Sequence, residues 1–265
     1  MHQLRRFSVS VLWLALSAVL ILPVSVAAQE SVQWKEIEPG FEFTRYELGP
    51  PAVIRPEVYL LKFNPRRFSF HAYAAGQNTD VRTLTKRFGG IAGINANFFD
   101  ERGNALGLVV SDGLVKQKLH KGGKVLTGVF AVKASGQAGI EHRDGFNPAD
   151  ALDAVQAGPR LVENGRPLKI SSGEDSSRRS GIAITKNNEI ILYATLLRFP
   201  GASLNDIQQM LVDPSLNVVH ALNLDGGGSS QLFVESFASL QGETFISGGD
   251  AVPVGIVVKR KGQVQ

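Results

Sequence analysis

A carboxylate, three glycines and two hydroxyl residues follow an apolar run late in the chain. The segment reads Asp225-Gly226-Gly227-Gly228-Ser229-Ser230, directly after Asn223-Leu224. Glycines let a backbone approach a ligand closely, and successive N–H groups that point at one spot bind an anion. Asp225, at the end of a strand-like run, is well placed for chemistry. A tight glycine turn capped by Asp225 explains the same residues without a ligand, so both interpretations stay open.

The segment differs from the best-known glycine-rich motifs. It has no lysine for a phosphate-binding P-loop, no G-x-G-x-x-G and no G-x-S-x-G nucleophile elbow. The chain contains no Cys, which excludes disulfides, thiolate metal sites and cysteine catalysis. The five histidines have no metal-ligand spacing, so the sequence assigns no metal site and no cofactor. A divalent cation held by Asp225 and neighbouring carboxylates stays open.

A second segment, Asn95-Ala96-Asn97-Phe98-Phe99, carries two amides beside two aromatic rings. The amides of Asn95 and Asn97 can hold sugar hydroxyls or phosphate oxygens, and an aromatic face can stack on a sugar ring. For the two Phe side chains, core packing is the better interpretation. Asp100, which follows them, then belongs to a turn.

A third segment is Gln156-Ala157-Gly158-Pro159. The amide of Gln156 could bind a ligand, and Gly158 with Pro159 would position the backbone. A purely structural role explains it equally well. A fourth, Arg178-Arg179, can clamp a phosphate, although such pairs are usually solvated. A basic strip over residues 116–124 is typical of a solvated face and, in a minority of proteins, of a surface that attracts an anionic polymer.

Many short elements must position these residues, because 28 Gly and 12 Pro argue against a helical bundle. Strands are predicted over 53–63, 67–74, 91–95, 105–111, 114–118, 126–133, 181–185, 189–197, 218–224, 231–234 and 251–259. Helices are predicted over 79–88 and 203–212, the second with a Ser203-x-x-Asp206 capping box, and a short helical turn over 147–152. Strands outnumber helices without alternating regularly with them. We therefore expect an α+β fold with a mostly antiparallel or mixed β-sheet core.

The N-terminus has the pattern of a secretory signal. Arg5 and Arg6 precede an apolar run, and Val26-Ala27-Ala28 supplies the small residues of a cleavage site. We expect a signal peptide over residues 1–28 and a single domain over 29–265, periplasmic or secreted, with no stable membrane anchor after cleavage. The formal net charge of +4 includes Arg5 and Arg6, so it is a weak argument for nucleic-acid binding, and we expect no nucleic-acid partner.

Taken together and in this order, the segments resemble the phosphodiester glycosidase family over about Tyr59 to Val258. The most specific match is Asn-Leu-Asp-Gly-Gly-Gly-Ser-Ser, which is intact at 223–230. The family's Asn-Gly-Gly-Phe-Phe-type motif matches 95–99, with Ala96 and Asn97 in place of glycines. Its Gly-Leu-Val hairpin matches 107–113, its Gln-Ala-Gly-Pro-x-Leu motif matches 156–161, and its Arg-Thr-Ala-type motif matches 179–181, with Ser180 in place of Thr.

The resemblance implies cleavage of a sugar-1-phosphodiester, and bacterial members imply envelope or exopolysaccharide glycans. A substrate with a phosphate and a sugar agrees with what the residues suggest without the resemblance: the glycine segment and the arginines can bind a phosphate, and the amides can bind a sugar. Under this hypothesis Asp225 stabilises or attacks the anomeric carbon, and Arg179 holds the phosphate together with backbone N–H groups. Asn95 completes the expected catalytic set. The expected substrate-binding residues are Asn97, Gln156, Gly158, Asn223, Gly226, Gly227, Gly228 and Ser229.

A second carboxylate is not fixed by the sequence; Asp100, Asp112, Glu163 and Asp250 all remain candidates. Two other functions also remain open. One is a non-catalytic module that binds an anionic envelope glycan. The other is a metal-assisted phosphodiesterase that cuts the P–O bond on the other side of the same linkage.

Overall fold

The computed structural model describes residues 32–49, 54–170, 175–196, 201–237 and 242–262, all within one compact unit, Val32–Gln265. The expected signal peptide lies outside the described residues, and so the export expectation stays a prediction. Within the described ranges, no helix combines the length and the hydropathy of a membrane span.

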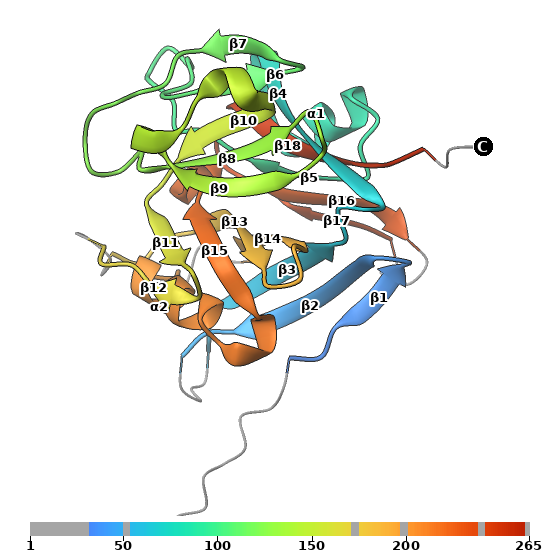
Figure 1. Ribbon diagram of the computed structural model, residues 1–265. Helices are drawn as coiled ribbons and strands as arrows, with labels where there is room; N and C mark the ends of the chain where they lie inside the picture. Colours follow the sequence, from blue (N-terminus) through green and yellow to red (C-terminus); the bar gives the residue numbers. More distant parts are fainter. Residues whose placement is uncertain (1–31, 50–53, 171–174, 197–200, 238–241, 263–265) are drawn as a thin grey trace, which may run out of the picture. The chain divides into compact units, whose positions relative to one another are not determined.

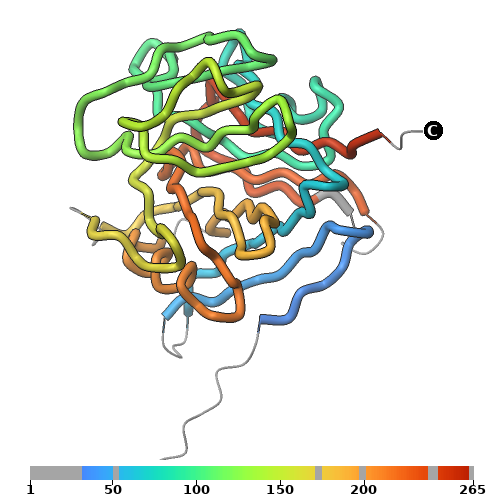
Figure 2. The backbone as a smooth tube through the Cα atoms, in the orientation of Figure 1, coloured from blue at the N-terminus to red at the C-terminus, as the bar shows by residue number. Residues whose placement is uncertain are grey.

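The first of three sheets has eight antiparallel strands and carries the strand that leads into the glycine segment. Figure 2 shows the chain building this sheet early, in blue, and returning to it late, in orange. In spatial order the strands are β1 (Lys35–Glu38), β2 (Phe41–Glu47), β3 (Glu57–Phe63), β14 (Ile190–Thr195), β13 (Ser180–Thr185), β15 (Val218–Asn223), β11 (Arg160–Glu163) and β12 (Arg166–Pro167).

The second and third sheets have five strands each and are also antiparallel (Figure 1). The second runs β7 (Leu114–Gln117), β6 (Val109–Ser111), β10 (Ala151–Ala157), β8 (Gly128–Lys133) and β9 (Ala138–His142). The third runs β17 (Gly242–Ile246), β16 (Leu232–Phe237), β5 (Ala92–Asn95), β18 (Val252–Arg260) and β4 (Phe68–Thr79).

The described residues contain two α-helices, α1 (Val81–Arg87) and α2 (Leu204–Leu211), and four single-turn 3₁₀ helices. This corrects the α+β expectation in one respect, because the fold is dominated by antiparallel β-structure. The expected helical turn over 147–152 is reduced to the 3₁₀ turn Pro148–Asp150, since strand β10 begins at Ala151.

The largest core forms where the three sheets meet. It combines Leu61 and Ile182 of the first sheet, Phe130 of the second, and Ile94 and Ile256 of the third, all buried. Each such side chain contributes about 1.5–3 kcal/mol when it is fully removed from water. The ends of strands from different sheets are therefore held at fixed positions, which is the condition for assembling a site from residues distant in sequence.

All eleven predicted strands overlap an observed strand, whereas β1, β2, β9, β10, β11, β12 and β17 lie outside the predicted ranges. Four of these seven, β1, β9, β12 and β17, are edge strands of their sheets. These edge strands carry charged side chains, as in the sequence KEIE of β1. The charged residues weaken the alternating hydrophobic pattern on which strand prediction depends.

Both predicted helices are confirmed, and their N-terminal caps explain where they begin. Asp80 accepts a hydrogen bond from Thr83 N at 2.8 Å at the start of α1. Ser203 and Asp206 form a reciprocal capping box on α2, with Asp206 N donating to Ser203 Oγ at 3.0 Å and Ser203 N to Asp206 Oδ2 at 2.8 Å. Buried Ile207, with Met210 and Leu211, then packs α2 against the first sheet.

We expect Ser203→Ala to lower the free energy of unfolding by about 1 kcal/mol, because the Asp206 N–H in the first turn of α2 loses its hydroxyl acceptor. Chemical denaturation at pH 7 measures the change, and Ser203→Thr, which keeps a hydroxyl, is the matched control. Equal midpoints for the alanine variant and the wild type would show that the cap contributes nothing.

Candidate active site at the glycine-rich segment

Asp225 lies just beyond the end of β15, and its backbone joins two sheets. The Asp225 carbonyl accepts from Asn95 Nδ2 at 2.7 Å and from Ser180 Oγ at 2.8 Å, while Asp225 N donates to Ala96 O at 3.0 Å. Asn95 Oδ1 accepts from Gln231 N at 3.0 Å. These bonds hold the end of β15 against β5 of the third sheet. Asn95 is fully buried and contacts the backbone of Asp225, which gives it the geometry of a positioning residue.

The carboxyl group of Asp225 has an unusual environment. Burial raises its pKa to about 6, although hydrogen bonds from the Ser229 hydroxyl and the Gly226 N–H oppose that rise. The negative charge of Asp250 raises the pKa further. A carboxyl group that titrates near neutrality beside a second carboxylate is typical of a catalytic site.

The glycine segment turns tightly next to Asp250. Gly227 has a φ of +61°, and a Cβ on Gly228 would lie 2.3 Å from Asp250 Oδ2, so a side chain at position 228 would displace the Asp250 carboxylate. The N–H groups of Gly227 and Ser229 donate to Arg178 O and Gly226 O within the protein. The expected anion nest is therefore smaller than the sequence suggested, because these two N–H groups are already used within the protein.

A pocket of about 490 Å³ opens against this segment. Its wall is made of the backbone of Gly227 and Gly228, the side chains of Arg178 and Asp250, and neighbouring Ser and Gly residues: Ser177, Ser247, Gly248 and Gly249. The pocket brings together an arginine, a carboxylate and glycine backbone from three segments distant in sequence. This combination can bind a phosphate and act on a bond next to it.

The two arginines take different places at this site. Arg178 lines the pocket, and it donates from Nη1 to Ser247 O at 2.6 Å and from Nη2 to Ser230 O at 2.7 Å. Its buried Nε has no partner among the described residues. Arg179 donates from Nε to Ala202 O at 2.9 Å, and its Nη1 lies 3.8 Å from the position that a Cβ on Gly226 would occupy. The sequence predicts a phosphate clamp by both arginines and a catalytic role for Arg179, whereas Arg178 is the one that lines the pocket.

Gln156 is surrounded by backbone. Its Oε1 accepts from Leu108 N at 3.0 Å and from His120 N at 2.8 Å, and its Nε2 donates to His120 O at 2.7 Å and Leu126 O at 2.9 Å. These bonds use all four hydrogen-bonding positions of the amide. A substrate contact by Gln156 would have to displace one of them, so this predicted role remains without support from the geometry.

Asn97 and Asn223 are also buried and hold strand ends. Asn97 Nδ2 donates to Leu108 O at 3.1 Å and Gln156 O at 3.0 Å. Asn223 Nδ2 donates to Gly158 O at 2.8 Å and Leu224 O at 2.7 Å. Gly158 is required by close packing, because a Cβ there would lie 2.0 Å from Val125 O. All three residues shape the backbone that leads to Asp225, and their direct substrate contacts remain predictions.

The structure separates the four candidate second carboxylates. Asp100 caps its own turn and accepts from Arg102 N at 2.9 Å and Asn104 N at 2.8 Å, and its hydrogen bonds to residue 104 hold its pKa below the ordinary value. Glu163 forms an ion pair with Arg160. Asp112 belongs to a different group, described next. Only Asp250, of these four, lines the pocket and acts electrostatically on Asp225.

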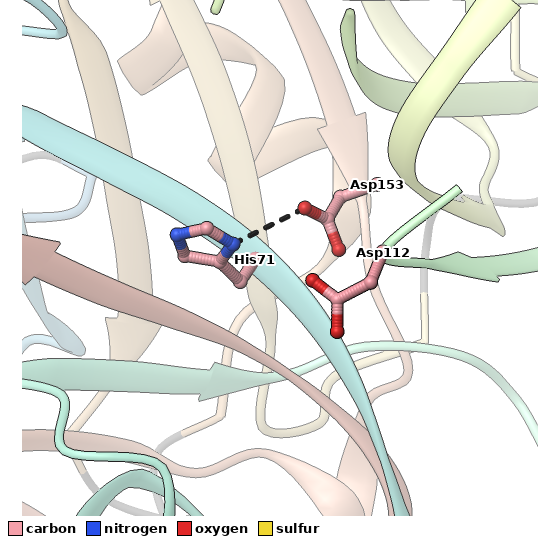
Figure 3. A group of neighbouring side chains, drawn as sticks. All are labelled: His71, Asp112 and Asp153. Atoms are coloured by element: carbon pink, nitrogen blue, oxygen red, sulfur yellow. Dashed lines mark hydrogen bonds and ion pairs between the residues drawn. The ribbon is translucent and has the colours of Figure 1, made fainter. Parts of the chain in front are cut away.

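His71, Asp112 and Asp153 form the one group of three in the described part of the chain that could hold a metal ion (Figure 3). One ligand atom from each lies within 4.8 Å of the others. His71 Nδ1 and the buried Asp153 Oδ2 are within hydrogen-bond distance at 3.2 Å, and Asp153 Oδ1 accepts from Ala72 N at 3.0 Å. The contact between His71 and Asp153 joins β4 to β10. None of the three residues of the group lines the pocket at the glycine segment.

The fold and the site define a β-rich protein with a carboxylate, arginine and glycine pocket at a strand end. The family model for phosphodiester glycosidases matches residues 88–259, and the chain belongs to that family. A search of curated protein sequences finds no match to this chain.

Solved structures share the fold. The zebrafish N-acetylglucosamine-1-phosphodiester alpha-N-acetylglucosaminidase catalytic domain, described as auto-inhibited by its pro-peptide, is 16% identical with a TM-score of 0.64, over 87% of this chain and 89% of that one. A hypothetical protein from Synechocystis is 18% identical with a TM-score of 0.62, over 89% of this chain, which spans 65% of that protein. A putative exported protein from Burkholderia pseudomallei is 14% identical with a TM-score of 0.53, over 80% and 75%.

We expect Asp225→Asn to stabilise the protein at pH 8. Because the folded-state pKa of about 6 lies above the ordinary value of 3.8, burying the ionised carboxylate on folding costs on the order of 1–3 kcal/mol. That cost is complete above pH 6 and disappears as the pH falls through the interval between the two pKa values. Chemical denaturation of both proteins at pH 8 and pH 4 checks this, and a gain of the same size at both pH values would contradict it.

Proposed function

We propose that this protein hydrolyses sugar-1-phosphodiester linkages, in glycans of the cell envelope or exopolysaccharide. Family membership supports the reaction class. One observation carries the proposal. Asp225, whose pKa is raised, lies next to a pocket that is lined by an arginine, by glycine backbone and by Asp250. The signal pattern of residues 1–28 supports export to the periplasm or the exterior.

In the proposed reaction, the bond between the anomeric carbon and the phosphate oxygen breaks, and the electron pair leaves with the phosphate. A phosphodiester gives a stable monoester anion, so the departing oxygen needs little help from a general acid. Arg178 and Arg179 hold the phosphate and its developing charge, together with the Gly228 N–H. Ionised Asp225 stabilises or attacks the anomeric carbon, and water then supplies the hydroxyl of the free sugar and releases one proton.

The first test uses residues 29–265 with an N-acetylglucosamine-1-phosphate alkyl ester in ¹⁸O-labelled water. We expect free sugar carrying the label from the wild type, and at least a ~100-fold lower kcat for Asp225→Asn because the ionisable carboxyl group is lost. Folded Asp225→Asn with unchanged kcat would remove Asp225 from the mechanism.

The position of the label separates the proposal from its rivals. Label in the phosphate would instead indicate a phosphodiesterase, and loss of that activity in His71→Ala would connect it to the candidate metal-binding group of Figure 3. Tight glycan binding without turnover would indicate a binding module.

The dependence of kcat/KM on pH tests the protonation state of Asp225. If the ionised carboxylate acts, the rate rises through an apparent pKa near 6 and stays high above it. Asp250→Asn removes a negative charge that favours the protonated form, so we expect the rising limb to move to lower pH. A rate that falls above pH 6 would show that protonated Asp225 is the active form.

A further inference from the structure

A second pocket, of about 540 Å³, lies beside the Gly158-Pro159 segment. Its cationic wall consists of Lys124, Arg160 and Lys169, with the His142 ring beside them, and its ten lining residues include no carboxylate. The remaining wall includes Val125, which is 51% exposed, and Pro159. The pocket therefore combines positive charge with apolar surface, whereas the pocket near Asp225 is built of glycine backbone and polar groups.

The backbone that presents these cations is held rigidly. Arg143 is buried and donates from Nη1 to Leu126 O at 3.0 Å and from Nη2 to Gly123 O at 2.7 Å. Gln156 Nε2 donates to the same Leu126 carbonyl. Arg160 N donates to Thr127 Oγ1 at 3.0 Å. A loop fixed on both sides loses little conformational freedom when a ligand binds.

Much of the charge in this pocket is available to a ligand. Lys124 and Lys169 are exposed and form no ion pair with any described residue. Arg160 pairs with Glu163 through Nη1, but its buried Nε has no partner in the described ranges. Residues 116–124 contain four lysines and no acid, so the positive potential extends beyond the pocket along the neighbouring loop.

The pocket is connected to the proposed active site through two carbonyl groups. Asn223 N donates to Pro159 O at 3.1 Å, and Asn223 Nδ2 donates to Gly158 O at 2.8 Å. Asn223 precedes Asp225 by two residues. The wall of the cationic pocket and the end of β15 are thus one hydrogen-bonded unit.

We propose that the pocket formed by Lys124, Arg160 and Lys169 binds an anionic segment of the glycan substrate, at a distance from the bond that is cleaved. The cations recognise phosphate or uronate groups, and the apolar wall packs against the C–H faces of sugar rings. This inference rests on the proposed function for the identity of the ligand as substrate. Binding itself is measurable without turnover.

The test is isothermal titration at 150 mM salt with three probes: trigalacturonate, inorganic tripolyphosphate and neutral maltotriose. The variant Lys124→Ala/Lys169→Ala is compared with Arg66→Ala/Arg67→Ala, which removes the same charge from another basic groove, lined by Arg66, Arg67, Arg260 and Lys261. We expect saturable binding of at least one anionic probe by the wild type, at least a ~10-fold loss in the lysine variant and little change in the arginine control. The anionic probe that binds identifies uronate or phosphate as the recognised group.

Equal losses of affinity in both variants would show that only net charge matters and would overturn the proposal. Binding of maltotriose with the same affinity as the anions would also overturn it, as would the absence of saturable binding of either anion. The titrations are repeated in Asp225→Asn, where we expect unchanged affinity. If the protein turns over its substrate and the lysine variant binds normally, only this inference fails. If binding follows the expectation and no substrate is cleaved, only the proposed function fails.

Discussion

The site depends on the hydrogen bonds around the backbone of Asp225. Asn95 and Ser180 donate to its carbonyl, and its N–H donates to Ala96. These contacts fasten the end of β15 to two other strands, β5 and β13, which belong to different sheets. A buried carbonyl with two donors is costly to disturb, because each lost bond leaves a desolvated polar group. The position of the neighbouring carboxylate is therefore set by the junction of two sheets.

That junction also places a carboxylate where ionisation is unfavourable. Burial and the nearby charge of Asp250 raise the pKa of Asp225, and hydrogen bonds from Ser229 and Gly226 only partly compensate. Such an arrangement reduces the stability of the folded state at neutral pH. Such destabilising groups are common where function requires a reactive side chain, and this supports the proposed chemical role of Asp225, whereas the amide of Gln156 is fully hydrogen-bonded to backbone.

Local signals in the sequence predicted local structure well. The Ser203 capping box is confirmed, and Asp80 caps the other predicted helix. Asp-Gly and Asn-Gly pairs are typical turn signals, and at Asp112-Gly113 and Asn164-Gly165 the residues Asp112 and Asn164 adopt positive φ. Each depends on interactions within about four residues, so it can be read from a short window. The charged edge strands were missed because their stability comes from pairing with a neighbour rather than from their own hydrophobic pattern.

By itself, the sequence determined the glycine segment, the strand that precedes it and the family motifs around Asn95, Gln156 and Arg179. Only the tertiary structure decided that Arg178 and Asp250 line the pocket, and that the amide of Gln156 is occupied by backbone. Asp250 is 25 residues from Asp225 in sequence, and no periodicity connects them. Their interaction arises because β16 and β18 pair on either side of β5, which returns the chain to the end of β15.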